Sequence, residues 1–313
     1  MSFPPPAISI LVCTRNRPED VRRCVPTILA NRFGDFELLV VDQSDGAETA
    51  DFLESTGDAR VRYLPSRTRG LARARNIALL NARAPLVAFT DDDCIIDECW
   101  IGALVEEFGQ HPEIQGLYGR VLPWGDHFQE GLFCHCLIAD ENERVIAEPA
   151  PPHRYLGHGN NMAFRRELFL RVGLYNPGMG AGTRLKAGED TDLTYRALRA
   201  RLPLMYSGRP LVYHNNWKTH AAADRLDFGY VVGFVMVFGK FFLSGDRVAG
   251  RCLRDRLGEL VTDLRECVQW RNWRKFRQTL QKFYYYAYGF LPALYFRIKG
   301  DPRWPVTSEI PRN

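Results

Sequence analysis

Three consecutive aspartates, Asp91 to Asp93, follow a short apolar run that is typical of a buried strand (residues 85–90). Adjacent negative charges repel one another, so a fold gains little from placing them at a strand end without a counterion. Hard divalent cations such as Mg²⁺ and Mn²⁺ take oxygen ligands, usually one or two carboxylates together with phosphate oxygens and water. Because ligands bind beyond the carboxyl ends of strands in open α/β sheets, the run indicates a metal–diphosphate site. On the triplet alone, a solvated acidic turn that caps a helix is an equal alternative.

Strand and helix signals alternate around this triplet. The segments typical of buried strands are residues 8–13, 36–41, 61–64 and 85–90. Such alternation predicts an α/β fold with a mostly parallel sheet and right-handed crossovers. Three of these strands end in polar residues, at 14–16, 42–45 and 91–93. Parallel strands point their carboxyl ends to one edge, so we expect the three polar clusters in one cleft. No GxGxxG follows the first strand, which argues against a dinucleotide-binding fold.

Composition places few limits on the function. The 313 residues are enough for one large domain, or for one domain with an appendage. A hydrophobic content of 46% and a charged content of 25% are ordinary for a folded soluble protein. Nothing at the N-terminus reads as a secretory signal, so we expect a cytoplasmic protein with eight reduced cysteines. The spacing in Cys134-His135-Cys136 is not that of a zinc ribbon or finger. We expect no nucleic-acid partner.

Five segments together resemble the family 2 glycosyltransferases, which have the GT-A fold. They occur in the family's order and approximate spacing, at residues 8–17, 40–44, 70–76, 91–93 and 188–190. Each segment alone is moderately specific, whereas the ordered set is strongly specific. The resemblance implies a GT-A nucleotide-sugar-binding fold with a mostly parallel central sheet. It also implies an inverting enzyme that moves a sugar from a nucleotide-diphospho-sugar, with a UDP-sugar favoured, to an acceptor hydroxyl.

The resemblance assigns a group of polar residues to the nucleotide. Asp42 stands where the family recognises the base, and an ionised carboxylate only accepts hydrogen bonds, which suits a ring N–H. A turn or helix-capping role is the alternative for Asp42, and an unpaired helix-surface residue is the alternative for Arg75. The nucleotide-binding candidates are Thr14, Arg15, Asn16, Asp42, Arg75, Asp91 and Asp92.

The resemblance also implies a metal site. Asp91 and Asp93 resemble a DxD motif, whose last carboxylate binds Mn²⁺ or Mg²⁺ and whose first holds the ribose or a metal-bound water. Because the middle residue is also an aspartate, the sequence leaves open which two of the three aspartates take these roles. Asp93 is favoured as the direct metal ligand. His214 follows another strand and resembles a histidine that completes the metal shell, since neutral imidazole suits Mn²⁺. The alternative for His214 is a packed residue.

Asp190 resembles the family's catalytic base, which takes the proton of the acceptor hydroxyl as that hydroxyl attacks the anomeric carbon. Glu189 is expected to orient it, Asp192 is expected to be structural, and a helix cap is the alternative role for Asp190. The residues expected to contact the donor or acceptor sugar are His158, Asn160, Asn161 and Trp124, the last of which lies in a loop-rich insertion (residues 123–152).

The last third differs in character. Residues 228–243 carry one charge but are shorter than the about 20 apolar residues that a membrane-spanning helix needs. Residues 246–282 contain ten Lys or Arg against five Asp or Glu, next to aromatic-rich segments. This pattern predicts a helical module on an anionic membrane surface. Packing on the catalytic core, a homodimer interface and a spanning helix are the alternatives. We therefore expect a catalytic domain over residues 1–222 and a helical region over 223–313, peripheral at the inner face of a membrane.

Two other functional classes compete with sugar transfer. A sugar-phosphate nucleotidylyltransferase would normally carry a Gly-rich, basic phosphate loop after the first strand, which residues 14–17 do not supply. A non-catalytic scaffold of a polysaccharide assembly complex would have no use for both a metal site and a base. The expected acceptor is a glycan, a lipid-linked molecule or a small molecule, in polysaccharide, glycolipid or other glycoconjugate biosynthesis.

Overall fold

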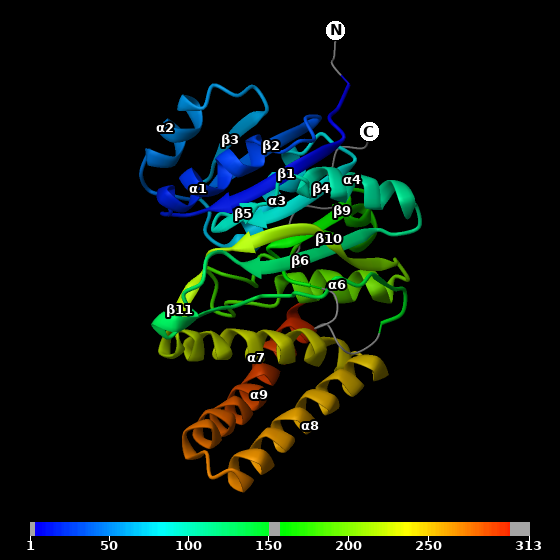
Figure 1. Cartoon of the computed structure of the whole chain (residues 1–313). Coiled ribbons are helices and arrows are strands. Elements are labelled where there is room, and N and C mark those ends of the chain that lie inside the picture. The colour runs from blue at the N-terminus through cyan, green and yellow to red at the C-terminus, as the bar shows by residue number, and fades with distance from the viewer. Residues whose placement is uncertain (1–3, 150–156, 301–313) are drawn as a thin grey trace.

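In the computed structural model, which describes residues 4–149 and 157–300, a nine-stranded sheet lies between helices and three long helices follow it (Figure 1). The strands of this sheet are β1 (Ile8–Thr14), β2 (Phe36–Asp42), β3 (Val61–Pro65), β4 (Leu86–Asp91), β5 (Cys94–Ile96), β6 (Gly116–Pro123), β8 (Arg144–Ile146), β9 (Asn161–Arg165) and β10 (Leu204–His214). Its order is β3-β2-β1-β4-β9-β6-β10-β5, and β8 pairs with β10. We call the part up to residue 219 the sheet region.

Helices cover both faces of the sheet because its strands are apolar on both sides. The helices of the sheet region are α1 (Pro18–Leu29), α2 (Glu48–Ser55), α3 (Leu71–Asn81), α4 (Trp100–Gln110), α5 (Leu168–Val172) and α6 (Glu189–Arg199). Side chains alternate along a strand, so Ile10 and Val12 of β1 join the core cluster under α1 and α4, whereas Leu11 joins the one under α3, α5 and α6. Such doubly covered strands are typical of parallel sheets.

The pairing confirms the expected mostly parallel sheet. β1 runs parallel to β2 and β4, and β2 runs parallel to β3. β6 is parallel to β10, while β9 lies antiparallel between β4 and β6. The register places Thr14 opposite Asp42, and Cys13 opposite Asp91. The polar residues after β1, β2 and β4 therefore lie at one edge of the sheet, as the sequence predicts.

The insertion after β6 contains more regular structure than expected. It includes the 3₁₀ helix η1 (Phe128–Glu130), β7 (Leu132–Cys134) and β8, and β7 pairs with β11 (Trp217–Thr219). β8 extends the main sheet beside β10. Three-residue strands carry too little periodicity to be recognised in a sequence, which explains why a loop was expected. The last residues of the predicted insertion, 150–152, lie outside the described residues.

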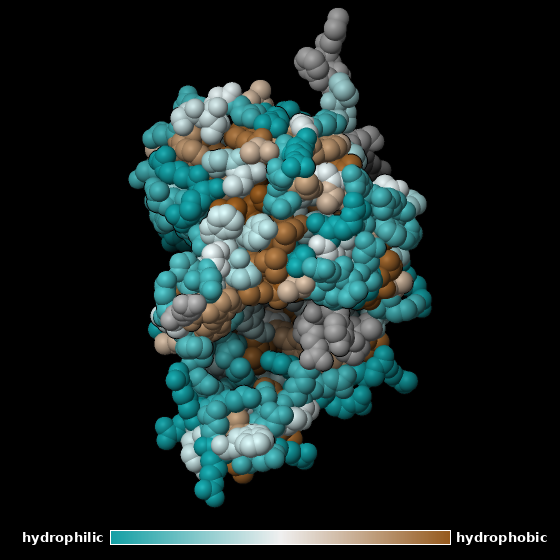
Figure 2. Space-filling model, in the orientation of Figure 1, coloured by the Kyte–Doolittle hydropathy of each residue, from teal (hydrophilic) through white to brown (hydrophobic). Residues whose placement is uncertain are grey.

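Three helices form what we call the helical region: α7 (His220–Phe242), α8 (Arg247–Gln269) and α9 (Trp273–Lys299). α7 lies across the sheet region, and α8 and α9 form a hairpin beyond it (Figure 1). On the face shown in Figure 2, hydrophilic side chains cover most of this hairpin. Asp246 and Asn272 cap α8 and α9 with their side chains, which divides the basic stretch 246–282 between two helices.

Burial of α7 explains the apolar run that the sequence places near residues 228–243. Residues 231–238 are buried, and they share one core cluster with Met179, Leu185 and Tyr195 of the sheet region. Among the described residues, no helix is both long enough and apolar enough to cross a membrane. The boundary at residue 222 stays a prediction; α7 itself begins at His220.

A buried ion pair joins the helical region to the sheet region. Lys240 of α7 lies 2.6 Å from Asp192 of α6, which also pairs with Arg196 at 2.8 Å, and Asp192 and Lys240 are buried.

We expect Asp192→Ala to lower the free energy of unfolding by about 3–5 kcal/mol, because it takes the carboxylate away from a buried cation. Urea unfolding of the full chain would measure this. Adding Lys240→Met should recover part of the loss, and Asp255→Ala on the exposed surface of α8 is the control. Unchanged stability of Asp192→Ala would contradict a structural role.

Candidate active site

The aspartate triplet ends β4 and is held by an arginine. Arg17 donates from Nη1 to Asp92 at 2.7 Å and from Nη2 to Asp93 at 2.9 Å. Thr14 donates its hydroxyl hydrogen to the other oxygen of Asp92 at 2.7 Å. Asp92 and Asp93 are buried, whereas the side chain of Asp91 is 34% exposed. The middle aspartate therefore fastens the loop after β1, and Asp91 is the member of the triplet that reaches solvent.

His214 stands beside Asp93 because β5 and β10 pair, with His214 opposite Cys94. Its Nε2 lies 3.3 Å from Oδ1 of Asp93. Its Nδ1 lies 2.8 Å from the carbonyl oxygen of His135, and the Cys134 thiol is 3.6 Å from the same nitrogen. A histidine that donates from Nδ1 to a carbonyl presents Nε2 to a ligand. The Cys134-His135-Cys136 segment thus orients His214, a role that the sequence did not predict.

The charges of this pair support each other. Burial lowers the pKa of His214, but hydrogen bonding to Asp93 outweighs it and raises that pKa to about 10. Burial likewise raises the pKa of Asp93, yet the hydrogen bond and charge of His214 and the charge of Arg17 bring it below its ordinary value. The protonated His214 and the ionised Asp93 form an ion pair beside Arg17, so a metal bound by both residues would have to displace the proton on Nε2 of His214.

The residues present fit a divalent cation. Apart from Nε2 of His214 at 3.3 Å, the buried Oδ1 of Asp93 has no partner among the described residues, so it can serve as a ligand. Ligand atoms of Asp93, Cys94 and His214 lie within 4.8 Å of one another. Burial holds the pKa of the Cys94 thiol well above its usual value, and a neutral thiol is a poor ligand for a hard cation. Asp93 and His214 are therefore the better pair, with Asp91 on the open side.

Arg75 connects the triplet to the start of α6. Its Nη1 lies 3.2 Å from Glu189, and its Nη2 lies 3.1 Å from the carbonyl oxygen of Gly159 and 3.5 Å from Asp91. Arg75 is buried, with its guanidinium over the ring of Tyr175. The structure places Arg75 between carboxylates of β4 and α6, where it can position both. The predicted contact of Arg75 with the nucleotide stays a prediction.

The acidic pair Glu189 and Asp190 opens α6. Oδ1 of Asp190 accepts the backbone N–H of Thr191 at 2.8 Å, and its Oδ2 faces Gly159, where a Cβ would lie only 3.0 Å away. Glu189 is buried, and burial together with the charge of Asp190 raises its pKa to about 7. Arg75 is thus close to carboxylates from both strand β4 and helix α6, so it brings the triplet and Asp190 into one site.

The edge formed by β1 and β2 carries the remaining nucleotide candidates. Asp42 is buried and accepts the backbone N–H of Ser44 at 2.8 Å and the hydroxyl of Tyr63 at 3.2 Å. Each carboxylate oxygen has two lone pairs, so it can still accept from a base. Asn16 has a positive φ of 54° and joins the two loops through Ser44 and Asp45. Nε of Arg15 is buried and makes no hydrogen bond within the described residues.

The four sugar candidates differ in how free their side chains are. Asn161 accepts from the Trp100 indole and donates to the carbonyl oxygens of Arg120 and Pro210, so its amide is fully used inside the sheet. Asn160 is buried, but neither polar atom of its amide has a partner among the described residues. An unpaired buried amide costs about 1–3 kcal/mol, so Asn160 suits a bound ligand. Both N–H groups of the Asn161 amide are already used, so only the second lone pair of Oδ1 is left for a sugar, and the predicted sugar contact of Asn161 stays a prediction.

His158 and Trp124 both lie near His214. Burial lowers the pKa of His158, and the charge of Asp190 opposes this shift. Trp124 is 45% exposed, donates its backbone N–H to the carbonyl oxygen of His214 at 3.0 Å and packs edge-on against Tyr213. An exposed indole beside His214 is available for stacking on a sugar.

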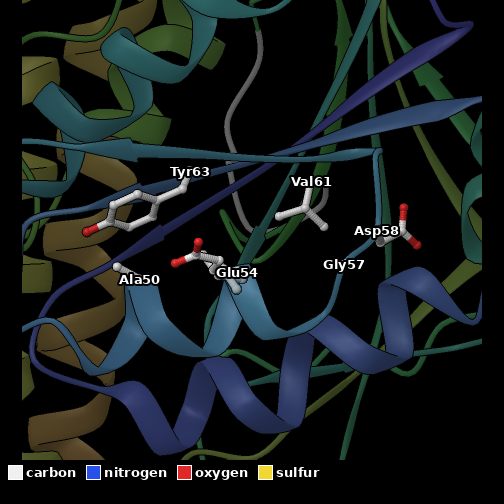
Figure 3. Close-up of a pocket in the computed structure, with 7 residues that line it drawn as sticks. Ala50, Glu54, Gly57, Asp58, Val61 and Tyr63 are labelled. Carbon is white, nitrogen blue, oxygen red and sulfur yellow. The ribbon is translucent and has the colours of Figure 1, made fainter.

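An open cavity of about 350 Å³ lies between α2 and β3 (Figure 3). Its lining residues are Ala50, Leu53, Glu54, Gly57, Asp58, Val61 and Tyr63. Tyr63 also donates to Asp42, but no other candidate residue lines the cavity. It is therefore separate from the Asp91–Asp93 site, and we assign it no role in the chemistry.

The sheet order, the aspartate turn at the end of β4 and the acidic start of α6 define a GT-A nucleotide-sugar-binding fold. The model of the family described as glycosyl transferase family 2 matches residues 9–172. The chain belongs to this family.

Curated relatives align with part of the chain. The glucosyl-dolichyl phosphate glucuronosyltransferase of Haloferax volcanii is 27% identical over 182 residues, which are 55% of this chain and 57% of that protein. The uncharacterized glycosyltransferase EpsJ of Bacillus subtilis is 27% identical over 174 residues, 54% of this chain and 51% of that protein. The chain thus spans about half the length of these curated relatives.

Solved structures share the fold over a larger part. A mannosyltransferase from Pyrobaculum calidifontis, in complex with GDP-Man and Mn²⁺, superposes with a TM-score of 0.60 at 15% identity, covering 94% of this chain and 87% of that one. Residues 1–349 of S. aureus TarS, in complex with UDP-GlcNAc, give a TM-score of 0.56 at 15% identity, covering 73% and 66%. At these identities the likeness establishes the fold.

Proposed function

We propose that the protein is an inverting, metal-dependent glycosyltransferase that moves a sugar from a nucleotide-diphospho-sugar to an acceptor hydroxyl. One observation carries this proposal: Arg75 lies 3.5 Å from Asp91 and 3.2 Å from Glu189, which supports one site for the proposed metal ligands and the proposed base. The relatives named above are glycosyltransferases, which supports a transferase rather than a nucleotidylyltransferase. For the donor, we propose a UDP-sugar as the favoured nucleotide-diphospho-sugar.

Asp190 is the general base of this proposal. Its Oδ1 is fixed by the N–H of Thr191, while Oδ2 is the oxygen available to an acceptor hydroxyl near Gly159. One displacement at the anomeric carbon forms the new C–O bond, breaks the bond to the nucleoside diphosphate and inverts the centre. The hydroxyl proton passes to Asp190. Glu189 acts through Arg75, which fixes the start of α6.

Asp93 and His214 would hold Mn²⁺ or Mg²⁺, with Asp91 directed to the open side. When bound, the cation would supply Lewis-acid stabilisation of the negative charge on the departing diphosphate. Asp42, Thr14, Arg15 and Asn16 form the edge proposed to face the nucleoside, and Asp92 holds that edge through Thr14 and Arg17. Asn160, His158 and Trp124 are proposed to contact the donor or acceptor sugar.

The acceptor and the location complete the proposal. A Haloferax relative is named for a glucosyl-dolichyl phosphate, a lipid-linked acceptor. This supports a lipid-linked acceptor over a soluble glycan or small molecule, in glycolipid, polysaccharide or other glycoconjugate biosynthesis. We propose that the enzyme works in the cytoplasm, peripherally at the inner face of a membrane.

The test is a thermal-shift panel of UDP, GDP, CDP and TDP, each with and without Mn²⁺. We expect one nucleotide to raise the unfolding temperature only when Mn²⁺ is present, and the corresponding nucleotide-sugar to be hydrolysed slowly without acceptor. No shift with any nucleotide would overturn the transferase assignment in favour of a non-catalytic scaffold.

Gly159 offers a test of the site's geometry. A Cβ at this position would lie 2.8 Å from Nη2 of Arg75 and 3.0 Å from Oδ2 of Asp190. Gly159→Ala should therefore displace both groups and lower donor turnover by about 10²-fold, since displacements of about 1 Å cost that much. Turnover and unfolding temperature are measured together. Gly109→Ala, in helix α4 with no atom near the added Cβ, is the matched control. Equal turnover in both variants would contradict this geometry.

A further inference from the structure

One side of α9 carries a continuous row of exposed apolar side chains. From Leu280 onward members of the row recur every three or four positions, and Trp273 lies two turns before Leu280, so they lie along one face of the helix. The row consists of Trp273, Leu280, Tyr284, Tyr288, Leu291, Leu294, Tyr295 and Ile298. Leu291 and Ile298 are 64% and 70% exposed. The buried residues of α9 occupy the opposite face, where Tyr286, Gly289, Ala293 and Phe296 pack toward α7 and α8.

Charge accompanies this row. α9 contains six Lys or Arg and no Asp or Glu, and the basic residues cluster at its two ends. Arg274, Lys275 and Arg277 lie in the first turns, and Arg297 and Lys299 lie in the last. Trp270, which is 75% exposed, precedes α9 at the tip of the hairpin. Tryptophan and tyrosine beside basic residues are the side chains that favour a lipid–water interface.

We propose that this face of α9 docks on an anionic lipid surface, with the helix lying in the plane of the interface. The apolar row is suited to the boundary between headgroups and acyl chains, and the basic ends are suited to acidic headgroups. A second copy of the chain is the competing occupant. An antiparallel pairing of two α9 helices would bring the basic N-terminal turns of one against the basic C-terminal turns of the other, without any acidic partner on either helix. Charge complementarity therefore selects the lipid.

Two helices, α7 and α9 itself, separate the docking face from the proposed base. On one side of α7, Gly233 packs so closely on the chain before Glu189 that a Cβ would lie 2.8 Å from the carbonyl oxygen of Ala187. On another side of α7, Val235 packs against Gly289 of α9, where an added Cβ would lie 2.6 Å away. Resting on the proposed function, this arrangement puts the start of α6 about two helix diameters, or about 20 Å, from the lipid surface, which suits an acceptor hydroxyl borne by a lipid.

The test is co-sedimentation of the full chain with phosphatidylcholine vesicles that contain or lack phosphatidylglycerol. We expect binding to the phosphatidylglycerol vesicles, weakened by salt. Leu291→Glu/Ile298→Glu should reduce it at least about tenfold, since the change places two acids on an interfacial face. Arg274→Gln/Arg277→Gln should reduce it by about tenfold or more, because each basic residue contributes several-fold at an anionic surface. Val145→Glu, at an apolar position on β8 that is 48% exposed, should bind as the unchanged protein does.

Separate measurements keep this result distinct from the proposed function. Each variant is examined for its unfolding temperature and for the nucleotide-dependent thermal shift, neither of which depends on vesicles. Loss of vesicle binding with both properties intact supports the docking face. Absence of binding by the unchanged protein would overturn it, and so would a dimer in solution that Leu291→Glu/Ile298→Glu converts to a monomer.

Discussion

Replacing Asp190 with asparagine is expected to lower the rate of sugar transfer by about 10²–10⁴-fold while donor binding is retained. In the unchanged protein the N–H of Thr191 donates to Oδ1 of Asp190 at 2.8 Å. The amide oxygen of asparagine can accept the same hydrogen bond, so the start of α6 should keep its geometry. The amide cannot take a proton from the acceptor hydroxyl. Release of nucleoside diphosphate in the presence of acceptor measures the rate, and the metal-dependent thermal shift measures donor binding.

Two further variants define what the Asp190 result means. Asp255→Asn, at an exposed position of α8, should leave both measurements unchanged. Glu189→Gln removes the charge that faces Nη1 of Arg75 and should disturb positioning rather than proton transfer, so its rate loss should be smaller. Transfer at the normal rate by Asp190→Asn would show that another group is the base.

The strands that form the site were predictable because their sequences leave little choice. β1, β2 and β4 are apolar on both faces and end abruptly in polar residues, which is what doubly covered parallel strands require. The parallel pairing then fixes their polar ends at one edge. The sequence therefore predicts that Thr14, Asp42 and Asp91 lie close together.

Contacts between residues far apart in the sequence could not be predicted in this way. Arg17 binds two carboxylates that lie 75 and 76 residues further on, and the His135 carbonyl orients a histidine 79 residues away. Neither pairing leaves a local periodicity. Short β7 and β11 bring the Cys134 segment to His214, and each has only three residues.

Burial decided between alternatives that the sequence left open. For Arg75 one alternative was an unpaired residue on the helix surface, but the residue is buried between β4 and α6, although the pattern of α3 is only weakly one-sided. For the apolar stretch of α7, packing on the core and a spanning helix were both alternatives, and the stretch forms the core between the sheet region and the α8–α9 hairpin. The pattern of such a helix is that of a buried one, and tertiary packing alone distinguishes the two settings.

Asp93→Ala is expected to abolish metal-dependent nucleotide binding. The change removes the buried carboxylate oxygen that faces His214 and the acceptor of the hydrogen bonds from Arg17 and Asn216. The loss should exceed the about 10–100-fold that removal of an outer-shell partner costs. Isothermal titration of Mn²⁺, alone and with the nucleotide chosen by the thermal-shift panel, measures it without relying on turnover.

Asn216 provides a graded comparison for Asp93. It donates its amide N–H to Oδ2 of Asp93 at 2.7 Å and touches the proposed cation only through that carboxylate. Asn216→Ala should therefore weaken Mn²⁺ binding by about 10–100-fold, between the unchanged protein and Asp93→Ala. Asp263→Ala on the surface of α8 should have no effect. If Asp93→Ala kept a Mn²⁺-dependent nucleotide shift, the cation would have to bind elsewhere, and Asp93 with His214 would be an ion pair of the fold rather than a metal site.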